Sequence, residues 1–112
     1  MNELNQYGIL SGNEIRQRMS KGDIIIDPFD DSRLGPNSYN LRLHPRMLVY
    51  TEAVLDPKSD NRTREIIIPP EGYVLKPGRV YIASTEEWTE TRNLVPMLVG
   101  RSSVGRLGLA VH

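Results

Sequence analysis

The chain has 112 residues, and its 14 lysines and arginines balance 14 aspartates and glutamates to a formal net charge of zero. A neutral chain has no global field that would attract a nucleic-acid backbone, so any anion site must be local. No cysteine occurs in the sequence, which excludes disulfides and cysteine-ligated zinc sites. The length suits one domain over residues 1–112, of a size at which oligomerisation would add to a modest core.

The composition favours a mainly β protein. Hydrophobic residues make up 38% of the chain, and eight prolines and nine glycines interrupt it, a balance typical of short strands and turns. Residues 1–10 contain no basic segment followed by an apolar core, and no apolar run approaches the length of a membrane span. We therefore expect a soluble, cytoplasmic protein with neither a membrane nor a nucleic acid as its partner.

The first predicted element is a short helix near the N-terminus. Residues 11–14 read Ser-Gly-Asn-Glu, the form of a capping box, and Ile15 and Met19 lie four positions apart behind it. Gly22 is placed to end the helix. Residues 24–26, all isoleucine, then predict a short apolar strand that Asp27-Pro28 breaks.

Three strands are expected in the middle of the chain. Residues 38–43 alternate between apolar and polar side chains, the period of a half-buried strand. A second strand is expected at residues 47–50, after a break at His44-Pro45. The charged residues 56–64 predict an exposed loop, and the β-branched run 66–68 predicts the third strand.

A hairpin and a final strand are expected in the second half. Residues 73–75 and 80–83 are apolar and flank Pro77-Gly78, an order that fits a type II turn and hence a hairpin. Residues 86–88 are expected to begin another loop. The apolar residues 95–99 predict a last strand, which delivers the chain to a polar segment.

That polar segment holds a dense group of hydrogen-bond donors. Arg101 and Arg106 enclose the adjacent hydroxyls of Ser102 and Ser103 and the turn-permitting Gly105. Hydroxyls and backbone N–H groups can hold phosphate oxygens, and guanidinium groups add charge-assisted bonds, which makes the segment a candidate site for a triphosphate. On these residues alone, a polar turn with solvated arginines is at least as good an interpretation.

Two further features have simple structural interpretations. Residues 36–40 could contact a ligand, but a turn that leads into a strand explains them with less. Trp88, the only tryptophan, is expected to anchor a core or an interface rather than to stack on a base.

The sequence offers little support for a protein-held metal ion. His44 and His112 are the only histidines and lie far apart in sequence, and His44 is expected at the surface. Asp27, Asp30 and Asp31 could collect a divalent ion, although a solvated acidic loop is the interpretation we favour.

Five blocks of the sequence form an ordered set that covers nearly the whole chain. They are residues 9–12 (Ile-Leu-Ser-Gly), 26–29 (Ile-Asp-Pro-Phe), 35–43 (Gly-Pro-Asn-Ser-Tyr-Asn-Leu-Arg-Leu), 75–78 (Leu-Lys-Pro-Gly) and 100–109 (Gly-Arg-Ser-Ser-Val-Gly-Arg-Leu-Gly-Leu), the last followed by Val111 and His112. Together they resemble the N-terminal part of the dCTP deaminase family, which is related to the trimeric dUTPases. The Asn-Ser-Tyr-Asn form of residues 37–40 looks closest to members that both deaminate dCTP and hydrolyse the resulting dUTP to dUMP.

The resemblance implies a distorted, jelly-roll-like β-barrel of the dUTPase-like type with one short N-terminal helix, in a homotrimer whose active sites are shared between subunits. In that family the Arg-Ser-Ser segment grips the triphosphate, usually with Mg²⁺ on its oxygens, and deamination proceeds without zinc. The triphosphate-binding positions carried over are Arg101, Ser102, Ser103, Val104, Gly105 and Arg106. Of these, Ser102 and Arg106 match the catalytic positions that help to hold the attacking water and to stabilise charge near the base. The absence of cysteine agrees, because zinc-dependent deaminases need a His/Cys ligand set.

The resemblance therefore implies a hydrolase of pyrimidine deoxynucleotide metabolism that converts dCTP to dUTP, with dTTP as a candidate regulator. In relatives, the segment after the Val-His pair carries a base-recognition loop and a glutamate that acts as general base, whereas this sequence ends at His112. We expect the 112-residue chain alone, as a fragment or a truncated product, to lack turnover and to expose apolar surface at residues 107–111. The alternative is a non-catalytic nucleotide-binding or assembly module with the same barrel.

Overall fold

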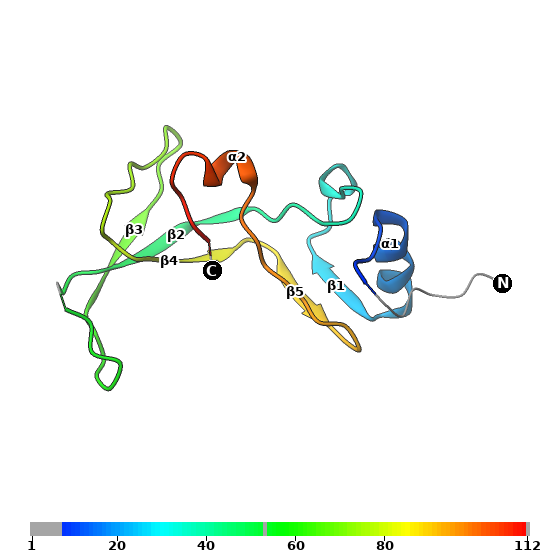
Figure 1. Cartoon of the computed structure of the whole chain (residues 1–112), viewed down its shortest axis with the longest axis horizontal. Helices are drawn as coiled ribbons and strands as arrows, with labels where there is room; N and C mark the ends of the chain where they lie inside the picture. The colour runs from blue at the N-terminus through cyan, green and yellow to red at the C-terminus, as the bar shows by residue number, and fades with distance from the viewer. Residues whose placement is uncertain (1–7, 53, 112) are drawn as a thin grey trace.

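The computed structural model describes residues 8–52 and 54–111 (Figure 1). In chain order its elements are α1 (Gly12–Lys21), β1 (Ile24–Asp27), the 3-10 helix η1 (Asp31–Arg33), β2 (Leu43–Tyr50), β3 (Thr63–Ile67), β4 (Tyr81–Thr85), β5 (Trp88–Thr91) and α2 (Ser102–Gly105). Strands outweigh helices, which confirms the mainly β prediction. None of these described helices is long and apolar enough to cross a membrane.

The strands form two separate antiparallel sheets. One sheet pairs β1 with β5, and the other has the order β3-β2-β4. The two sheets lie towards opposite ends of the molecule, with α1 beside β1 (Figure 1). Over the described residues the two sheets remain open and do not close into a barrel. The mainly β part of the fold prediction is therefore confirmed, and a closed barrel is not observed in these residues.

Helix α1 forms as the sequence predicts. The Ser11 hydroxyl accepts a hydrogen bond from the Glu14 backbone N–H (3.2 Å), and the Glu14 carboxylate accepts one from the Ser11 N–H (3.0 Å), which completes the capping box. The helix ends at Gly22, whose left-handed conformation (φ 81°) glycine adopts without steric strain. Strand β1 follows directly and ends at Asp27, as expected.

The expected strand over residues 38–43 is wrong for most of its length, since only Leu43 belongs to a strand, β2, and Tyr39 forms a single isolated bridge with Leu34. Residues 35–40 form a tight turn instead, in which the Gly35 N–H donates to the Ser38 carbonyl (2.8 Å) and the Asn40 N–H donates to the Arg33 carbonyl (3.0 Å). These local bonds satisfy backbone groups that a strand would need to pair with a neighbour, so the alternation of the sequence does not become a ladder. The alternative prediction for residues 36–40, a turn, is confirmed.

Strand β2 is longer than predicted and passes through the proline that was expected to break it. Its register against β4 is irregular between Leu43 and Met47, which is where Pro45 lies. A proline has no N–H to donate, and such an irregularity accommodates it. The Pro45 carbonyl still accepts a hydrogen bond from the Ile68 N–H (2.7 Å), so the backbone remains tied to the end of β3.

The hydrophobic core lies in the three-stranded sheet. Met47, Val49 and Ile66 are buried, and Ile68 and Tyr81 pack against them. Met47 stands opposite Ile66 in the register of β2 with β3, so the two side chains share one face of the sheet. The stability of this sheet therefore depends on very few side chains.

The predicted hairpin is wrong, although its turn is present. Gly78 has the positive φ (76°) that a type II turn requires, but residues 73–75 form no strand, and β4 pairs with β2 instead. The eight residues of β2 offer buried cross-strand partners, whereas Val74 is 83% exposed. A partner distant in sequence has therefore displaced the local one.

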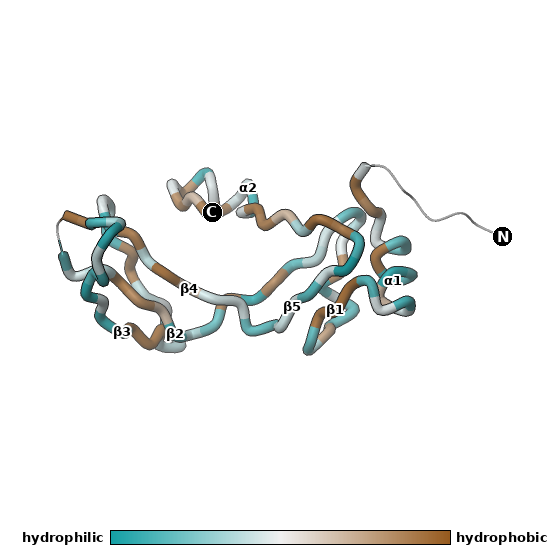
Figure 2. The backbone as a smooth tube through the Cα atoms, turned by 90° about the horizontal axis from the view of Figure 1, so that it is seen from below, coloured by the Kyte–Doolittle hydropathy of each residue, from teal (hydrophilic) through white to brown (hydrophobic). Residues whose placement is uncertain are grey.

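The last predicted strand is also wrong. Residues 95–99 form no strand among the described residues, and Val95 and Met97 are almost fully exposed. Figure 2 shows this hydrophobic stretch on the arm that leads to α2, away from the strands. The expected loop at residues 86–88 is wrong in part, because Trp88 opens β5 and is 69% exposed rather than buried in a core. A role for Trp88 at an interface stays a prediction.

Candidate functional site

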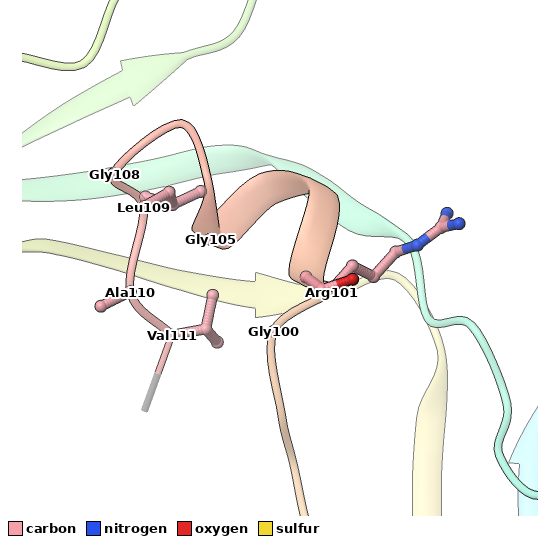
Figure 3. A pocket seen from close by; sticks show the side chains of 8 residues that line it. Gly100, Arg101, Gly105, Gly108, Leu109, Ala110 and Val111 are labelled. Carbon is pink, nitrogen blue, oxygen red and sulfur yellow. The ribbon is translucent and has the colours of Figure 1, made fainter.

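The predicted donor residues lie on a segment that folds back on itself, residues 100–111 (Figure 3). Arg101 is the N-cap of α2 and Arg106 its C-cap, and Gly108 reverses the chain with a positive φ (90°). The segment closes where Gly100 meets Val111, since a Cβ atom on Gly100 would stand 3.4 Å from the Val111 Cγ2 atom. A methyl group at Gly100 would therefore lie in van der Waals contact with Val111.

An open hollow of about 420 Å³ lies inside this segment. It is lined by Gly100, Arg101, Ser102, Gly105, Gly108, Leu109, Ala110 and Val111. The structure thus brings three of the predicted triphosphate-binding residues to the hollow, while Ser103, Val104 and Arg106 lie outside its lining. Figure 3 shows the Arg101 side chain extending away from the hollow, so its guanidinium group faces outwards.

The hydrogen-bond donors lie within residues 101–106, which we call the donor segment, and they are accessible to solvent. Arg101, Ser102, Ser103 and Arg106 are all exposed, and Val104 is half-buried. The N–H groups of Ser102 and Ser103 stand in the first turn of α2, where a helix provides no carbonyl partner of its own. Within the part of the chain that the structure describes, neither arginine forms an ion pair with a carboxylate. Both guanidinium groups are therefore available to an anion.

The acidic residues of the loop after β1 have protein partners. The Asp30 carboxylate accepts hydrogen bonds from the Ser32 side chain (2.7 Å) and backbone (3.0 Å), which lower the pKa of Asp30 below its ordinary value. Asp31 forms an ion pair with Arg16. These contacts favour the interpretation of the segment as a structured acidic loop.

Of the two histidines, only His44 lies within the described residues. His44 lies in β2, where it is half-buried rather than fully at the surface, and its Nδ1 atom accepts a hydrogen bond from the Arg46 N–H (3.1 Å). His112 lies outside the described residues.

Sequence reasoning missed a buried ion pair between Arg42 and Glu87. The Glu87 side chain has no exposed surface, and its Oε1 atom accepts from the Arg42 Nε atom at 2.8 Å. Both carboxylate oxygens also accept from the Arg42 backbone N–H, at 3.1 and 3.0 Å. The hydrogen bond that Arg42 donates to the Glu87 carboxylate is the largest cause of the raised pKa of Arg42. The two residues are 45 positions apart, so no local pattern could have linked them.

Comparison with known families identifies the class of protein to which this mainly β chain belongs. Residues 9–112 match the family model described as dCTP deaminase-like, and the chain belongs to this family. The mainly β architecture with one short N-terminal helix is consistent with a dUTPase-like fold.

Similar proteins carry related names. The chain is 59% identical over 104 residues to the "dCTP deaminase, dUMP-forming" of Hathewaya histolytica, which covers 93% of this chain and 60% of that protein. It is 60% identical over 104 residues to the "dCTP deaminase" of Rhodopirellula baltica, with 93% and 52% covered. A third relative, the "dCTP deaminase, dUMP-forming" of Clostridium acetobutylicum, is 54% identical over the same length, with 93% and 60% covered. The chain thus spans a little over half of the length of these curated relatives.

Proposed function

We propose that this chain supplies the triphosphate-binding part of a hydrolase that deaminates dCTP. The observation that carries the proposal is the family match over residues 9–112, together with relatives named for dCTP deamination. The products would be dUTP or, as in the relatives named dUMP-forming, dUMP. Such an enzyme belongs to pyrimidine deoxynucleotide metabolism in the cytoplasm, and dTTP is a candidate regulator of it.

The donor segment is the triphosphate site in this proposal. Arg101 and Arg106 bind phosphate oxygens through charge-assisted hydrogen bonds, and Ser102 and Ser103 bind them through hydroxyl and backbone N–H groups. Since α2 has a single turn, its dipole adds little, and the side chains carry most of the binding. Ser102 and Arg106 additionally hold the attacking water and stabilise charge near the base.

Magnesium enters this proposal with the nucleotide. Over residues 8–52 and 54–111 there is no group of three or more histidines, aspartates or glutamates that could hold a metal ion. The donor segment instead presents cationic and hydroxyl groups, which suit a triphosphate whose own oxygens bind Mg²⁺. A zinc site of the His/Cys type has no cysteine ligand in this sequence.

We also infer that the working form is a homotrimer with shared active sites. Support comes from the apolar side chains around the donor segment, since Val95, Met97 and Leu107 are 93%, 85% and 87% exposed. Large apolar side chains exposed at several positions near one site are typical of contacts with another polypeptide. Sedimentation velocity measures the assembly, and a monomer at all concentrations would contradict it.

Turnover is tested with two proteins, the 112-residue chain and a version extended past His112 with the corresponding residues of the Hathewaya histolytica relative. Each is incubated with dCTP and Mg²⁺, and loss of the cytosine amine is followed. We expect turnover by the extended protein and none by the 112-residue chain. Binding of dCTP without turnover by either protein would favour a non-catalytic nucleotide-binding module, and absence of both would reject the proposal.

The Arg101→Ala substitution should weaken dCTP binding by about 1.5–3 kcal/mol, because a hydrogen bond to a charged group is lost. Calorimetry with the Mg²⁺ complex of dCTP measures the change. Arg79→Ala is the matched control, since it removes the same charge from an exposed turn outside the donor segment. Equal affinities of the two variants would mean that the triphosphate binds elsewhere.

A further inference from the structure

The contacts between elements divide the molecule into two halves. In one half α1 packs on β1 and β1 pairs with β5, and in the other β2 pairs with β3 and β4. The chain crosses between the halves at residues 28–42 and again at Glu86-Glu87, where β4 has ended and β5 has yet to begin. Figure 1 shows β4 running into β5 with only this short link between them. A two-residue link that is bent at both residues leaves the angle between the sheets free unless other contacts hold it.

The Arg42–Glu87 pair joins the two crossings at that point. Three hydrogen bonds of 2.8, 3.1 and 3.0 Å run from Arg42 to the Glu87 carboxylate. The Glu86 N–H donates in return to the Arg42 carbonyl (2.9 Å), and the Thr85 hydroxyl donates to the Glu87 carbonyl (2.9 Å). The second crossing is therefore held at its backbone and at its one buried side chain.

The burial of this pair indicates a geometric role. The Glu87 side chain is completely buried, while the Arg42 side chain remains 34% exposed. Burying a carboxylate is expensive in solvation, and a buried ion pair is usually no more stabilising than apolar residues of similar volume. Such a pair instead restricts the geometry of the residues around it, because a charged group with several fixed hydrogen bonds tolerates few arrangements of its neighbours.

The donor segment, residues 101–106, is carried by the half that contains β5. After β5 the Thr91 hydroxyl donates to the Leu94 carbonyl (3.0 Å), and the chain then runs as an exposed arm to α2. In the path of the chain, the Glu86-Glu87 link therefore lies between the three-stranded sheet and the part that carries the donor segment (Figure 1).

We propose that Arg42 and Glu87 fix the angle between the two sheets, and that Glu87 is thereby a positioning residue for the donor segment. The second part rests on the triphosphate-binding function proposed above. Glu87 touches no nucleotide in this proposal, since it acts only through the backbone of the link and the arm that follows.

The angle is measured as a distance between two spin labels. Because the chain has no cysteine, Thr63→Cys in β3 and Thr89→Cys in β5 give two unique, exposed labelling sites, one in each sheet. We expect a narrow distance distribution in this labelled protein, measured by pulsed electron paramagnetic resonance. Glu87→Gln should broaden and shift the distribution, because the neutral amide holds Arg42 less strongly.

Glu86→Gln is the matched control, because its carboxylate lies 3.8 Å from the Arg42 guanidinium and is partly exposed. It should leave the distribution unchanged. Circular dichroism confirms that both sheets persist in each variant, and the near-isosteric glutamine guards against loss of the fold. A distribution in Glu87→Gln that matches the parent would overturn the proposed role of the pair.

The positioning role is tested on the same proteins with the Mg²⁺ complex of dCTP. Glu87→Gln should weaken its binding about tenfold, since misplacement of binding groups by about an ångström has effects of this size or larger. Arg101→Ala should weaken binding without changing the distance distribution. A broadened distribution with unchanged affinity would overturn the positioning role. Failure of the parent protein to bind dCTP would reject both the proposed function and the positioning role of Glu87. The spin-label distances would still show whether the Arg42–Glu87 pair fixes the angle between the two sheets.

Discussion

Replacing Ile66 with alanine is expected to lower the free energy of unfolding by about 2–5 kcal/mol, the range for truncation of a large aliphatic side chain in a core. Ile66 is 5% exposed and packs with Met47 and Val49, the other buried members of this cluster. A cavity in so small a cluster has few neighbours that could move to fill it. Urea denaturation followed by circular dichroism measures the change through the midpoint and slope of the transition.

Ile67→Ala provides the matched control, because it removes the same atoms from the next position of β3. Ile67 is 61% exposed, so its truncation should change the free energy of unfolding by less than about 0.5 kcal/mol. Similar losses in both variants would show that the other face of this sheet is covered in solution, contrary to the packing described above.

The sequence predicted well those elements whose signals are local. The capping box at Ser11 and Glu14 and the left-handed Gly22 fix both ends of α1 within a dozen residues. The turns at residues 35–40 and at Gly78 are likewise encoded by neighbours in the chain. In each of these places the bonds that satisfy the backbone come from nearby residues, so the pattern alone is sufficient.

Strand pairing could not be predicted in the same way. The apolar pattern of residues 73–75 fits a strand beside β4, but β2 pairs with β4 across more than thirty residues of chain. Residues 95–99 have an equally good strand pattern and no strand partner among the described residues. A strand requires a neighbour that completes its hydrogen bonds, and the identity of that neighbour is a property of the whole fold.

The same distinction between local and long-range signals applies to the candidate site and to the buried ion pair. Arg101, Ser102 and Gly105 were identified from one contiguous block, and the structure places all three around a single hollow. The Arg42–Glu87 pair lacked any such signal, since a charged residue in an alternating stretch and one in a presumed loop both suggest exposure. Only the pairing of the end of β4 with the start of β2, where Thr85 stands opposite Leu43, brings these two charges together.

The same ion pair should make the stability of the protein sensitive to acid. Burial acts to raise the pKa of the Glu87 carboxyl, but the hydrogen bonds and the positive charge of Arg42 outweigh burial and hold this pKa below its ordinary value. A carboxyl whose pKa is lower in the folded than in the unfolded chain stabilises the fold fully above its unfolded pKa. That stabilisation is lost as the pH falls through the folded pKa.

The charges around the pair act in a consistent direction. Glu86 and Tyr39 add to the effect of Glu87 in raising the pKa of Arg42, so Arg42 stays positive throughout the acid range. Asp30 also has a lowered pKa, chiefly through the Ser32 hydroxyl, and it contributes a second loss of stability in acid. A comparison of variants is therefore needed to isolate the part that comes from Glu87.

At neutral pH, Glu87→Ala should lower the free energy of unfolding by about 3 kcal/mol, near the lower end of the range for breaking a buried ion pair because Arg42 can turn towards water. Glu87→Gln should cost less, about 1.5–3 kcal/mol, since the amide oxygen still accepts hydrogen bonds.

Urea denaturation of the parent and Glu87→Gln between about pH 7 and pH 3 should give curves of unfolding free energy against pH that are parallel above about pH 5 and converge below it, as the parent carboxyl takes up its proton. Glu86→Gln, tested alongside, should keep the acid-dependent loss of the parent. A constant difference between the parent and Glu87→Gln across the whole range would mean that the Glu87 carboxyl has the same pKa in the folded and unfolded chains, and would remove the electrostatic basis of the pair.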